Sequence, residues 1–282
     1  ILNEVTIDGG SKIVVAGTGG AESNVKDSET IPSTYTCNFG NLIIYDSTNS
    51  TASNVNGSTM LNVKNGSLTL DHAVLDGSLI SKDDKASRQM IRVNKDCTLH
   101  ISGTTIQNMN YSQSDDGAIY IDGGKLEVDN STVNDTNSEY AIYCKDGTEC
   151  EIDSSNIIST GSGTYAAIIY NGTQKSFILK NSSVISEHYK SGLYCEAYAT
   201  CEIIDSQVES AEGTAAIHVA GFVNHGSCPK GNMDISGEKT KITGEKAIYY
   251  VNSFRYEIDT WSLNISGMAE LEATKGNALD FR

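Results

Sequence analysis

The sequence of 282 residues is poor in proline, in basic residues and in long apolar segments. It has two prolines, and its 20 Lys and Arg residues are outnumbered by 36 Asp and Glu, which gives a net charge of −16. This acidity repels phosphate backbones, so nucleic acid is not an expected partner. No apolar run approaches the about 20 residues that a membrane-spanning helix needs, so membrane insertion is not expected either.

The chain instead carries one short phrase many times: a small residue, an aliphatic residue, a residue expected to point outward, and a further apolar residue. Clear copies of the phrase are 118–121, 141–144, 167–170, 192–195, 216–219, 247–250 and 278–281, and weaker copies begin near Leu61 and Ile91. Successive copies lie 23 to 31 residues apart. A repeat of this length predicts a solenoid, in which each repeat forms one coil that stacks on the next.

Each repeat holds two further short segments that alternate between apolar and polar residues, as strands do. Between these two segments lies a corner residue of a type that tolerates a left-handed backbone. The corner residues are Gly103, Asn130, Ser154, Asn181, Asp205, Gly237 and Gly267. We therefore predict an all-β fold, a right-handed parallel β-helix with three short strands per coil and about eight to ten coils.

We expect the chain to form a single β-helix domain over 1–282, because no linker interrupts it. Residues 61–282 should form the regular coils. Residues 1–60 should form irregular coils, with strands near 5–7, 13–15 and 42–45 and a long surface loop at 17–36.

The repeated phrase followed by an Asx, Ser or Gly corner resembles the pectin-lyase-like β-helix superfamily from about residue 61 onward. The segments 116–119 and 140–142 look like repeats of polymorphic surface proteins and autotransporter passengers. The resemblance implies an architecture shared by lyases, glycosidases, adhesins and structural surface proteins, and it does not select one of these activities.

The resemblance also implies what a polysaccharide hydrolase of this fold would carry: aspartates on adjacent coils, with a His and a basic pair nearby. Paired carboxylates are needed to protonate the leaving oxygen and to activate water. The candidates are Asp83-Asp84 and Asp115-Asp116, but His225-Gly226 is more than a hundred residues away and no Arg-x-Lys follows it. We therefore expect no enzyme, no catalytic residue, no metal site and no cofactor.

Cysteine positions favour an oxidising compartment. Cys144 and Cys150 are six residues apart, as are Cys195 and Cys201, and alternation within the strands places all four side chains inside the coil. Each pair flanks one corner, so we expect the disulfides Cys144–Cys150 and Cys195–Cys201, with a free buried thiol as the alternative. The remaining cysteines, Cys37, Cys97 and Cys228, have no assigned partner.

Asn-x-Ser/Thr triplets occur nine times, which is about twice the frequency expected by chance. At Asn130 and Asn181, glycosylation competes with a role as corner residues. The other seven are candidate glycosylation sites: Asn49, Asn56, Asn65, Asn110, Asn134, Asn171 and Asn264. Together with the cysteine pairs, they favour a secreted, extracellular or cell-surface glycoprotein.

Four tyrosines occupy the same outward position of the repeated phrase: Tyr120, Tyr143, Tyr194 and Tyr249. Ile169 and His218 interrupt the row. Aligned aromatic rings on a sheet are either a glycan-stacking face or a ladder that stiffens the sheet.

These patterns predict a non-catalytic extracellular structural glycoprotein with the shape of a rigid rod. Its last copy of the phrase, with Leu279 and Phe281, begins another coil and then stops, so the rod is either cut from a longer chain or covered by a neighbour at this strand edge. Its expected partners are copies of itself or neighbouring structural proteins, joined head-to-tail into a filament, surface appendage or wall layer. The first alternative is a cell-surface adhesin or glycan-binding β-helix. The second alternative is an atypical polysaccharide lyase or hydrolase.

Overall fold

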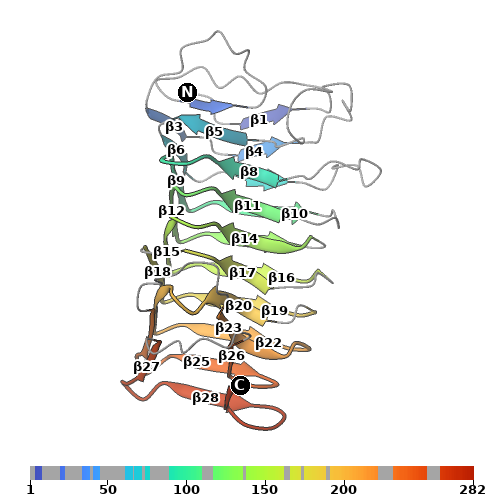
Figure 1. Ribbon diagram of the computed structural model, residues 1–282. Helices are drawn as coiled ribbons and strands as arrows, with labels where there is room; N and C mark the ends of the chain where they lie inside the picture. The colour runs from blue at the N-terminus through green and yellow to red at the C-terminus, as the bar shows by residue number, and fades with distance from the viewer. Residues whose placement is uncertain are drawn as a thin grey trace.

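The computed structural model describes seven strands between residues 4 and 76, and residues 89–109, 117–135, 138–161, 166–172, 175–188, 191–221, 231–252 and 261–282. The described part is all-β, without a helix. Three long sheets run side by side along one axis, so that the chain winds as a parallel β-solenoid with three strands per coil (Figure 1).

The first sheet has ten described strands. They are β2 (Gly20–Glu22), β5 (Leu61–Asn65), β8 (Gln89–Val93), β11 (Gly117–Ile121), β14 (Tyr140–Cys144), β17 (Ala166–Tyr170), β20 (Ser191–Glu196), β23 (Ala215–Gly221), β26 (Ile248–Asn252) and β29 (Leu279–Phe281).

The second sheet has nine described strands. They are β3 (Thr34–Asn38), β6 (Ser67–Asp71), β9 (Thr98–Ser102), β12 (Lys125–Asp129), β15 (Glu149–Asp153), β18 (Ser176–Lys180), β21 (Thr200–Ile204), β24 (Asn232–Ser236) and β27 (Ser262–Ile265).

The third sheet has eight described strands. They are β7 (Val74–Asp76), β10 (Thr105–Met109), β13 (Thr132–Asp135), β16 (Asn156–Ser159), β19 (Ser183–Ser186), β22 (Gln207–Ser210), β25 (Lys241–Gly244) and β28 (Glu270–Ala273). The strands β1 (Glu4–Ile7) and β4 (Asn41–Ile44) pair in parallel as a separate two-stranded sheet, and β4 lies against β7.

From β5 to β28 the described strands follow one another in eight sets of three, one from each sheet, and β29 begins a further set. Every pairing between successive sets is parallel and connects a strand to its equivalent in the next repeat. The aliphatic residue of the repeated phrase therefore stacks on the same residue of the next coil: Ile119 pairs with Ile142, and Ile142 pairs with Ile168. The period read from the sequence is the length of one coil.

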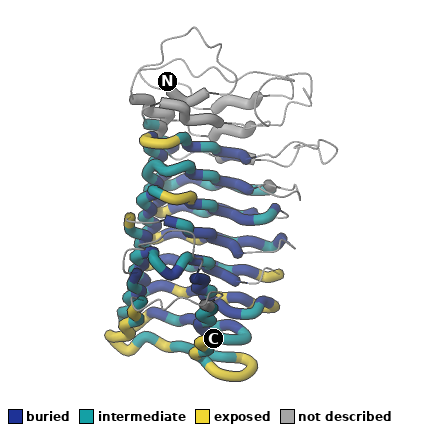
Figure 2. The backbone as a smooth tube through the Cα atoms, in the orientation of Figure 1, coloured by how far each residue is buried: buried dark blue, intermediate teal, exposed yellow. Residues whose placement is uncertain are grey.

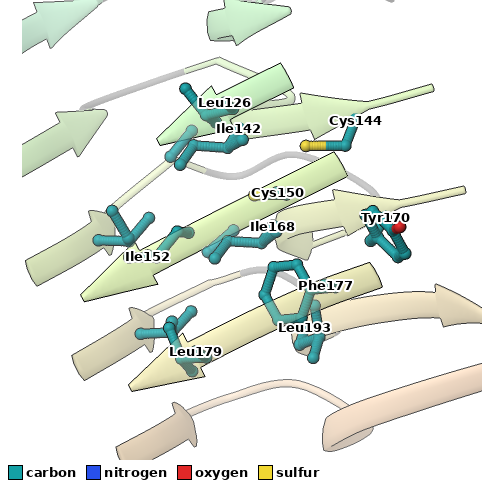
Figure 3. Packing of buried hydrophobic residues seen from close by; sticks show 14 of the residues in the cluster. Leu126, Ile142, Cys144, Cys150, Ile152, Ile168, Tyr170, Phe177, Leu179 and Leu193 are labelled. Carbon is teal, nitrogen blue, oxygen red and sulfur yellow. The ribbon is translucent and has the colours of Figure 1, made fainter. Parts of the chain in front are cut away.

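The core is a set of stacked columns inside the solenoid. Strands of the second sheet alternate buried and half-buried residues, so their inward aliphatics meet the buried residues of the first and third sheets. Figure 3 shows one stretch of this core, in which Ile142, Ile168 and Leu193 come from the first sheet and Ile152 and Leu179 from the second. All five side chains have no exposed surface. Burial of these columns is the main term that holds the coils together.

The corner between the second and third sheets has the backbone that the sequence predicts. Asn130, Ser154, Asn181 and Asp205 have φ between 45° and 49°, and the glycines at the other predicted corners also have positive φ. A residue with positive φ turns the chain sharply, and Asn, Asp and Gly adopt it at the least cost. The corner prediction is confirmed at all seven positions.

A hydroxyl ladder follows these corners and was not predicted. It consists of Thr104, Ser131, Ser155, Ser182, Ser206 and Thr240, all buried. The backbone N–H of Ser155 donates to Ser182 Oγ at 3.0 Å, and the N–H of Ser182 donates to Ser206 Oγ at 3.1 Å. Each serine hydroxyl donates in turn to the carbonyl two residues earlier, as Ser155 does to Asp153 at 2.6 Å. The ladder satisfies backbone groups that the sharp corner would otherwise leave buried without partners.

The N-terminal strands differ in part from the sequence prediction. The stretch 17–36, expected as a surface loop, contains β2 and the start of β3. The pairing of β2 with β5 is antiparallel, unlike every other described pairing in the three sheets. The expected strands at 5–7 and 42–45 correspond to β1 and β4, whereas 13–15 lies outside the described residues. A short antiparallel strand has no repeat pattern, so the sequence gives no signal for it.

Among the described coils, the C-terminal coil has many exposed residues (Figure 2). Among the described residues, the large hydrophobic side chains classed as exposed are Ile265, Met268, Leu279 and Phe281, which are 42%, 82%, 38% and 52% exposed. All four belong to this coil. In the part of the chain that the structure describes, β27, β28 and β29 are the last members of their sheets.

Candidate functional site

The predicted tyrosine row lies on the outer face of the first sheet. Strand register aligns Tyr120, Tyr143, Ile169 and Tyr194 on consecutive strands, followed by His218 and Tyr249. The aromatic side chains are half-buried, and Ile169 is only 7% exposed. The structure therefore confirms that the four tyrosines share one outward position.

Ring packing divides this row into two groups. Tyr120 and Tyr143 have ring centroids 5.2 Å apart, and the buried ring of Tyr140 packs on Tyr143 at 5.3 Å. His218 bridges Tyr194 and Tyr249, at 5.2 and 5.1 Å. The rings are tilted or edge-on to one another, with interplanar angles of 54° for Tyr120 and Tyr143 and 76° for Tyr194 and His218. This arrangement is that of a ladder, in which neighbouring rings contact each other.

Cations cover both ends of the row. The Arg92 guanidinium carbon lies 5.0 Å from the centre of the Tyr120 ring, and Lys246 Nζ lies 4.3 Å from the centre of the Tyr249 ring. Beside the row, Lys145 forms an ion pair with Asp122 at 2.9 Å, and this contact raises the pKa of the Lys145 ammonium. Cation–π contacts of this kind stabilise a ladder by about 0.5–1 kcal/mol at exposed sites.

A carboxyl group with a shifted pKa lies beside the same face. Glu196 is the last residue of β20, and Asp146 is in the turn after β14, two coils toward the N-terminus. Burial, with a smaller contribution from the Asp146 charge, raises the pKa of Glu196 to about 7. The sequence gives no signal for this carboxyl, because the shift depends on contacts between coils. A carboxyl whose pKa is raised by burial can act as a general acid.

The expected disulfides are not present. Cys144, Cys150, Cys195 and Cys201 are free thiols, as is Cys97. The inward placement was correct, since all four are buried. Cys150 hydrogen-bonds to Cys144, which together with burial raises the pKa of Cys150. A thiol–thiol hydrogen bond is longer than the about 2.05 Å of a disulfide, so each pair is adjacent without being bonded.

An aromatic layer separates the two thiol pairs. Register places Tyr170 between Cys144 and Cys195, and Phe177 between Cys150 and Cys201. The two rings contact each other at 5.3 Å, and the Tyr170 hydroxyl donates to the Thr148 carbonyl at 2.9 Å. Figure 3 shows Cys144 and Cys150 in the coil before this layer. Burial among these thiols raises the pKa of Tyr170, so its phenol stays neutral.

The candidate glycosylation sites differ in how accessible their amides are. Asn264 is exposed, although its Nδ2 donates to Asp234 at 2.6 Å. Asn171 Nδ2 donates to the Tyr143 hydroxyl at 3.1 Å, and its Oδ1 is buried. Asn134 is half-buried, also with a buried Oδ1. The geometry therefore favours Asn264 as the acceptor among these three, and it disfavours Asn171.

Several sequence candidates lie where the structure gives no side chains. Asn49, Asn56 and Asn110 lie outside the described residues, and Asn65 is described only as part of the backbone of β5. The candidate carboxylates Asp83-Asp84 and Asp115-Asp116, with His225-Gly226, lie outside as well. Within the described ranges there is no group of three or more His, Cys, Asp or Glu side chains able to bind a metal ion, and no helix long and apolar enough to cross a membrane.

No protein-family model, curated protein or solved structure matches the chain. The fold itself therefore defines the class, which is a parallel β-solenoid with three strands per coil. This class agrees with the resemblance to β-helix proteins at the level of architecture.

Proposed function

We propose that this chain is a non-catalytic extracellular structural glycoprotein, a rigid rod that assembles head-to-tail into a filament, surface appendage or wall layer. The observation that carries the proposal is the regular stack of described coils, in which each strand from β5 to β26 pairs in parallel with its equivalent in the next coil. A head-to-tail contact between the different ends of such a rod builds an open chain.

The interior of the solenoid supports a mechanical role. Stacked aliphatic columns and the hydroxyl ladder run from coil to coil, and the tyrosine row adds a second set of contacts outside the first sheet. Close-packed interiors resist deformation, so a continuous stack of coils is stiff along its axis.

The sequons support an extracellular location, with exposed Asn264 as an accessible acceptor. Membership of the pectin-lyase-like superfamily is part of this proposal, and it rests on the repeated phrase and the corners. Copies of the chain or neighbouring structural proteins are the partners it implies.

Sedimentation velocity of the chain 1–282 over a hundredfold concentration range tests the proposal. We expect a series of species that grow with concentration and keep the frictional behaviour of an elongating rod. A single species at all concentrations would contradict assembly.

A polysaccharide hydrolase or lyase is the second candidate, and the observation that favours it is Glu196. Its pKa of about 7, raised by burial and by Asp146, suits a general acid beside a sheet face with half-buried tyrosines. Digestion assays on a panel of polysaccharides separate this candidate from the rod. Activity that is lost in Glu196→Gln would establish it, and no digestion of any substrate would favour the structural role.

Glycan binding by the tyrosine row is the remaining alternative. The tyrosines are half-buried and contact neighbouring rings, which leaves less ring surface for a sugar, so the packing favours the ladder. A glycan array in which the wild type binds and Tyr194→Ala does not would instead support an adhesin.

A further inference from the structure

We propose that Tyr120 and Tyr143 form a site of oxidative cross-linking, at which hydrogen peroxide and a haem peroxidase join the two phenol rings into a dityrosine. The product is a covalent bond between neighbouring coils of one chain. The cysteines that the structure describes are all free thiols, so this bond supplies a link between coils that they do not. The inference goes beyond the proposed function, because it needs neither assembly nor a partner chain.

Strand register places the two phenols side by side. Tyr120 in β11 pairs with Tyr143 in β14, and both side chains leave the outer face of the first sheet, where they are half-buried. Neighbouring strands lie about 4.8 Å apart. The ring centroids are 5.2 Å apart, so the rings stay adjacent beyond the backbone. Their planes are inclined by 54°, and such an inclined pair, unlike a face-to-face stack, suits a bond between ring carbons.

The two hydroxyl groups lie near the same cation. Lys145 Nζ is held 2.9 Å from Asp122. This ion pair is the largest cause of the raised pKa of the Lys145 ammonium, and the phenols of Tyr120 and Tyr143 add to it. Both phenols are therefore within electrostatic reach of one ammonium. A nearby positive charge favours loss of the phenol proton, which the coupling reaction requires.

The other tyrosines of the row have no tyrosine beside them in register. Ile169 separates Tyr143 from Tyr194. His218 lies between Tyr194 and the next tyrosine of the row. Within the described row, strand register therefore joins two tyrosines directly only at Tyr120 and Tyr143.

Tyr140 is the competing partner, because its ring centroid lies 5.3 Å from that of Tyr143. Its side chain is only 2% exposed, and its ring lies so close over Gly117 that a side chain there would collide with it. Coupling requires two rings to shift toward each other, and close packing opposes such a shift. The half-buried ring of Tyr120 is less restricted, so we expect coupling of Tyr143 to Tyr120.

The reaction is an oxidation in which peroxide is reduced. Each phenol loses one electron and one proton, which gives two phenoxyl radicals. The radicals join through one ring carbon each, next to the carbon that bears the oxygen, and one C–C bond forms. The hydrogens on these two carbons then move to the oxygens and restore both phenols. In sum, two C–H bonds break, and hydrogen peroxide takes up two electrons and two protons to give two molecules of water.

Treatment of the chain 1–282 with hydrogen peroxide and a haem peroxidase tests the site. We expect dityrosine fluorescence from a product that migrates as a single chain on a denaturing gel. Its peptide map should contain the peptides of Tyr120 and Tyr143 joined together, lighter by two hydrogen atoms than the separate peptides. The yield should not depend on protein concentration, because both rings belong to one chain.

Two substitutions at the same outward position distinguish this site from general oxidation of tyrosines. Tyr143→Phe keeps the ring but removes the hydroxyl that the radical needs, and we expect it to abolish the cross-link to Tyr120. Tyr194→Phe removes a phenol from the same row and should leave the yield of that cross-link unchanged. Circular dichroism checks that both variants fold.

Three results would overturn the site: a wild-type chain without the cross-link, a joined pair of Tyr140 and Tyr143 in its place, or an equal loss of the cross-link in Tyr194→Phe and Tyr143→Phe. Products that join separate chains only would contradict it as well. The bond forms or fails to form within one chain, so the result is independent of the sedimentation test for assembly.

Discussion

At the scale of single residues, Glu196 links the structure to pH. Its pKa rises from 4.5 to about 7 in the folded chain, first because of burial and then because of Asp146. Between these two values the folded state binds more protons than the unfolded state. The free energy of unfolding therefore falls as the pH rises from about 4.5 to about 7, and this contribution is fully present only below that window.

Glu196→Gln should remove this part of the pH dependence. We expect the stability of the variant to decline less than that of the wild type between pH 5 and pH 8, as measured by urea unfolding at the two pH values. Glu202→Gln, on the outer face of β21, is the control and should keep the wild-type dependence. Equal slopes for the wild type and Glu196→Gln would show that the carboxyl is not buried as described.

The buried thiols give a second prediction at this scale. Because all four thiols are buried, we expect the folded chain to keep Cys144, Cys150, Cys195 and Cys201 reduced when it meets a disulfide oxidant such as oxidised glutathione. The layer of Tyr170 and Phe177 separates the pairs and prevents exchange between them. Peptide mapping under non-reducing conditions measures this. A bond between Cys144 and Cys195 would contradict the layered core.

At the scale of elements, the hydroxyl ladder should contribute measurably to stability. Ser182→Ala removes the acceptor of the Ser155 N–H and leaves that buried donor without a partner. We expect a loss of about 1–3 kcal/mol in the free energy of unfolding. Ser183→Ala, at the next position and half-buried on the outer face, is the matched control and should change stability by less than about 0.5 kcal/mol. Equal effects of the two would argue against the ladder.

The elements also show what the sequence can predict. The period, the inward aliphatics and the left-handed corners are properties of each repeat, so they can be read from one coil and checked in the next. The corner at Asn181 is an example, with φ of 47°. The sequence also contains a pattern for the hydroxyl ladder, since a Ser or Thr follows most corners. Its role could not be inferred from that pattern, because it depends on hydrogen bonds between coils.

Features that depend on contacts between coils were beyond prediction. The raised pKa of Glu196 follows from its burial and, to a smaller extent, from Asp146 two coils away. The sequence shows His218 as an interruption of the tyrosine row, whereas its ring contacts both Tyr194 and Tyr249. The inward placement of the four cysteines was predicted correctly, but the predicted disulfides were wrong. Strand alternation determines which way a side chain points, and it does not determine the distance between two sulfur atoms. The antiparallel strand β2 does not belong to the sequence repeat, so the repeat did not predict it.

At the scale of the whole molecule, the stacking order continues to the last described strand. This strand is held by Lys246, which contacts Asp280 at 2.9 Å, and by Arg282, which contacts the same carboxylate at 3.1 Å. These contacts keep Leu279 and Phe281 in register with the preceding coil. Under the proposed function, the described coils, stacked at about 4.8 Å each, form one unit of a longer structure.

Electron microscopy of the purified chain 1–282 at increasing concentration tests the central claim, which is end-to-end assembly of rigid rods. We predict particles of constant width whose lengths are whole multiples of one rod, with longer particles at higher concentration. Particles that keep the length of a single rod at every concentration, or that grow in width instead of length, would contradict the account.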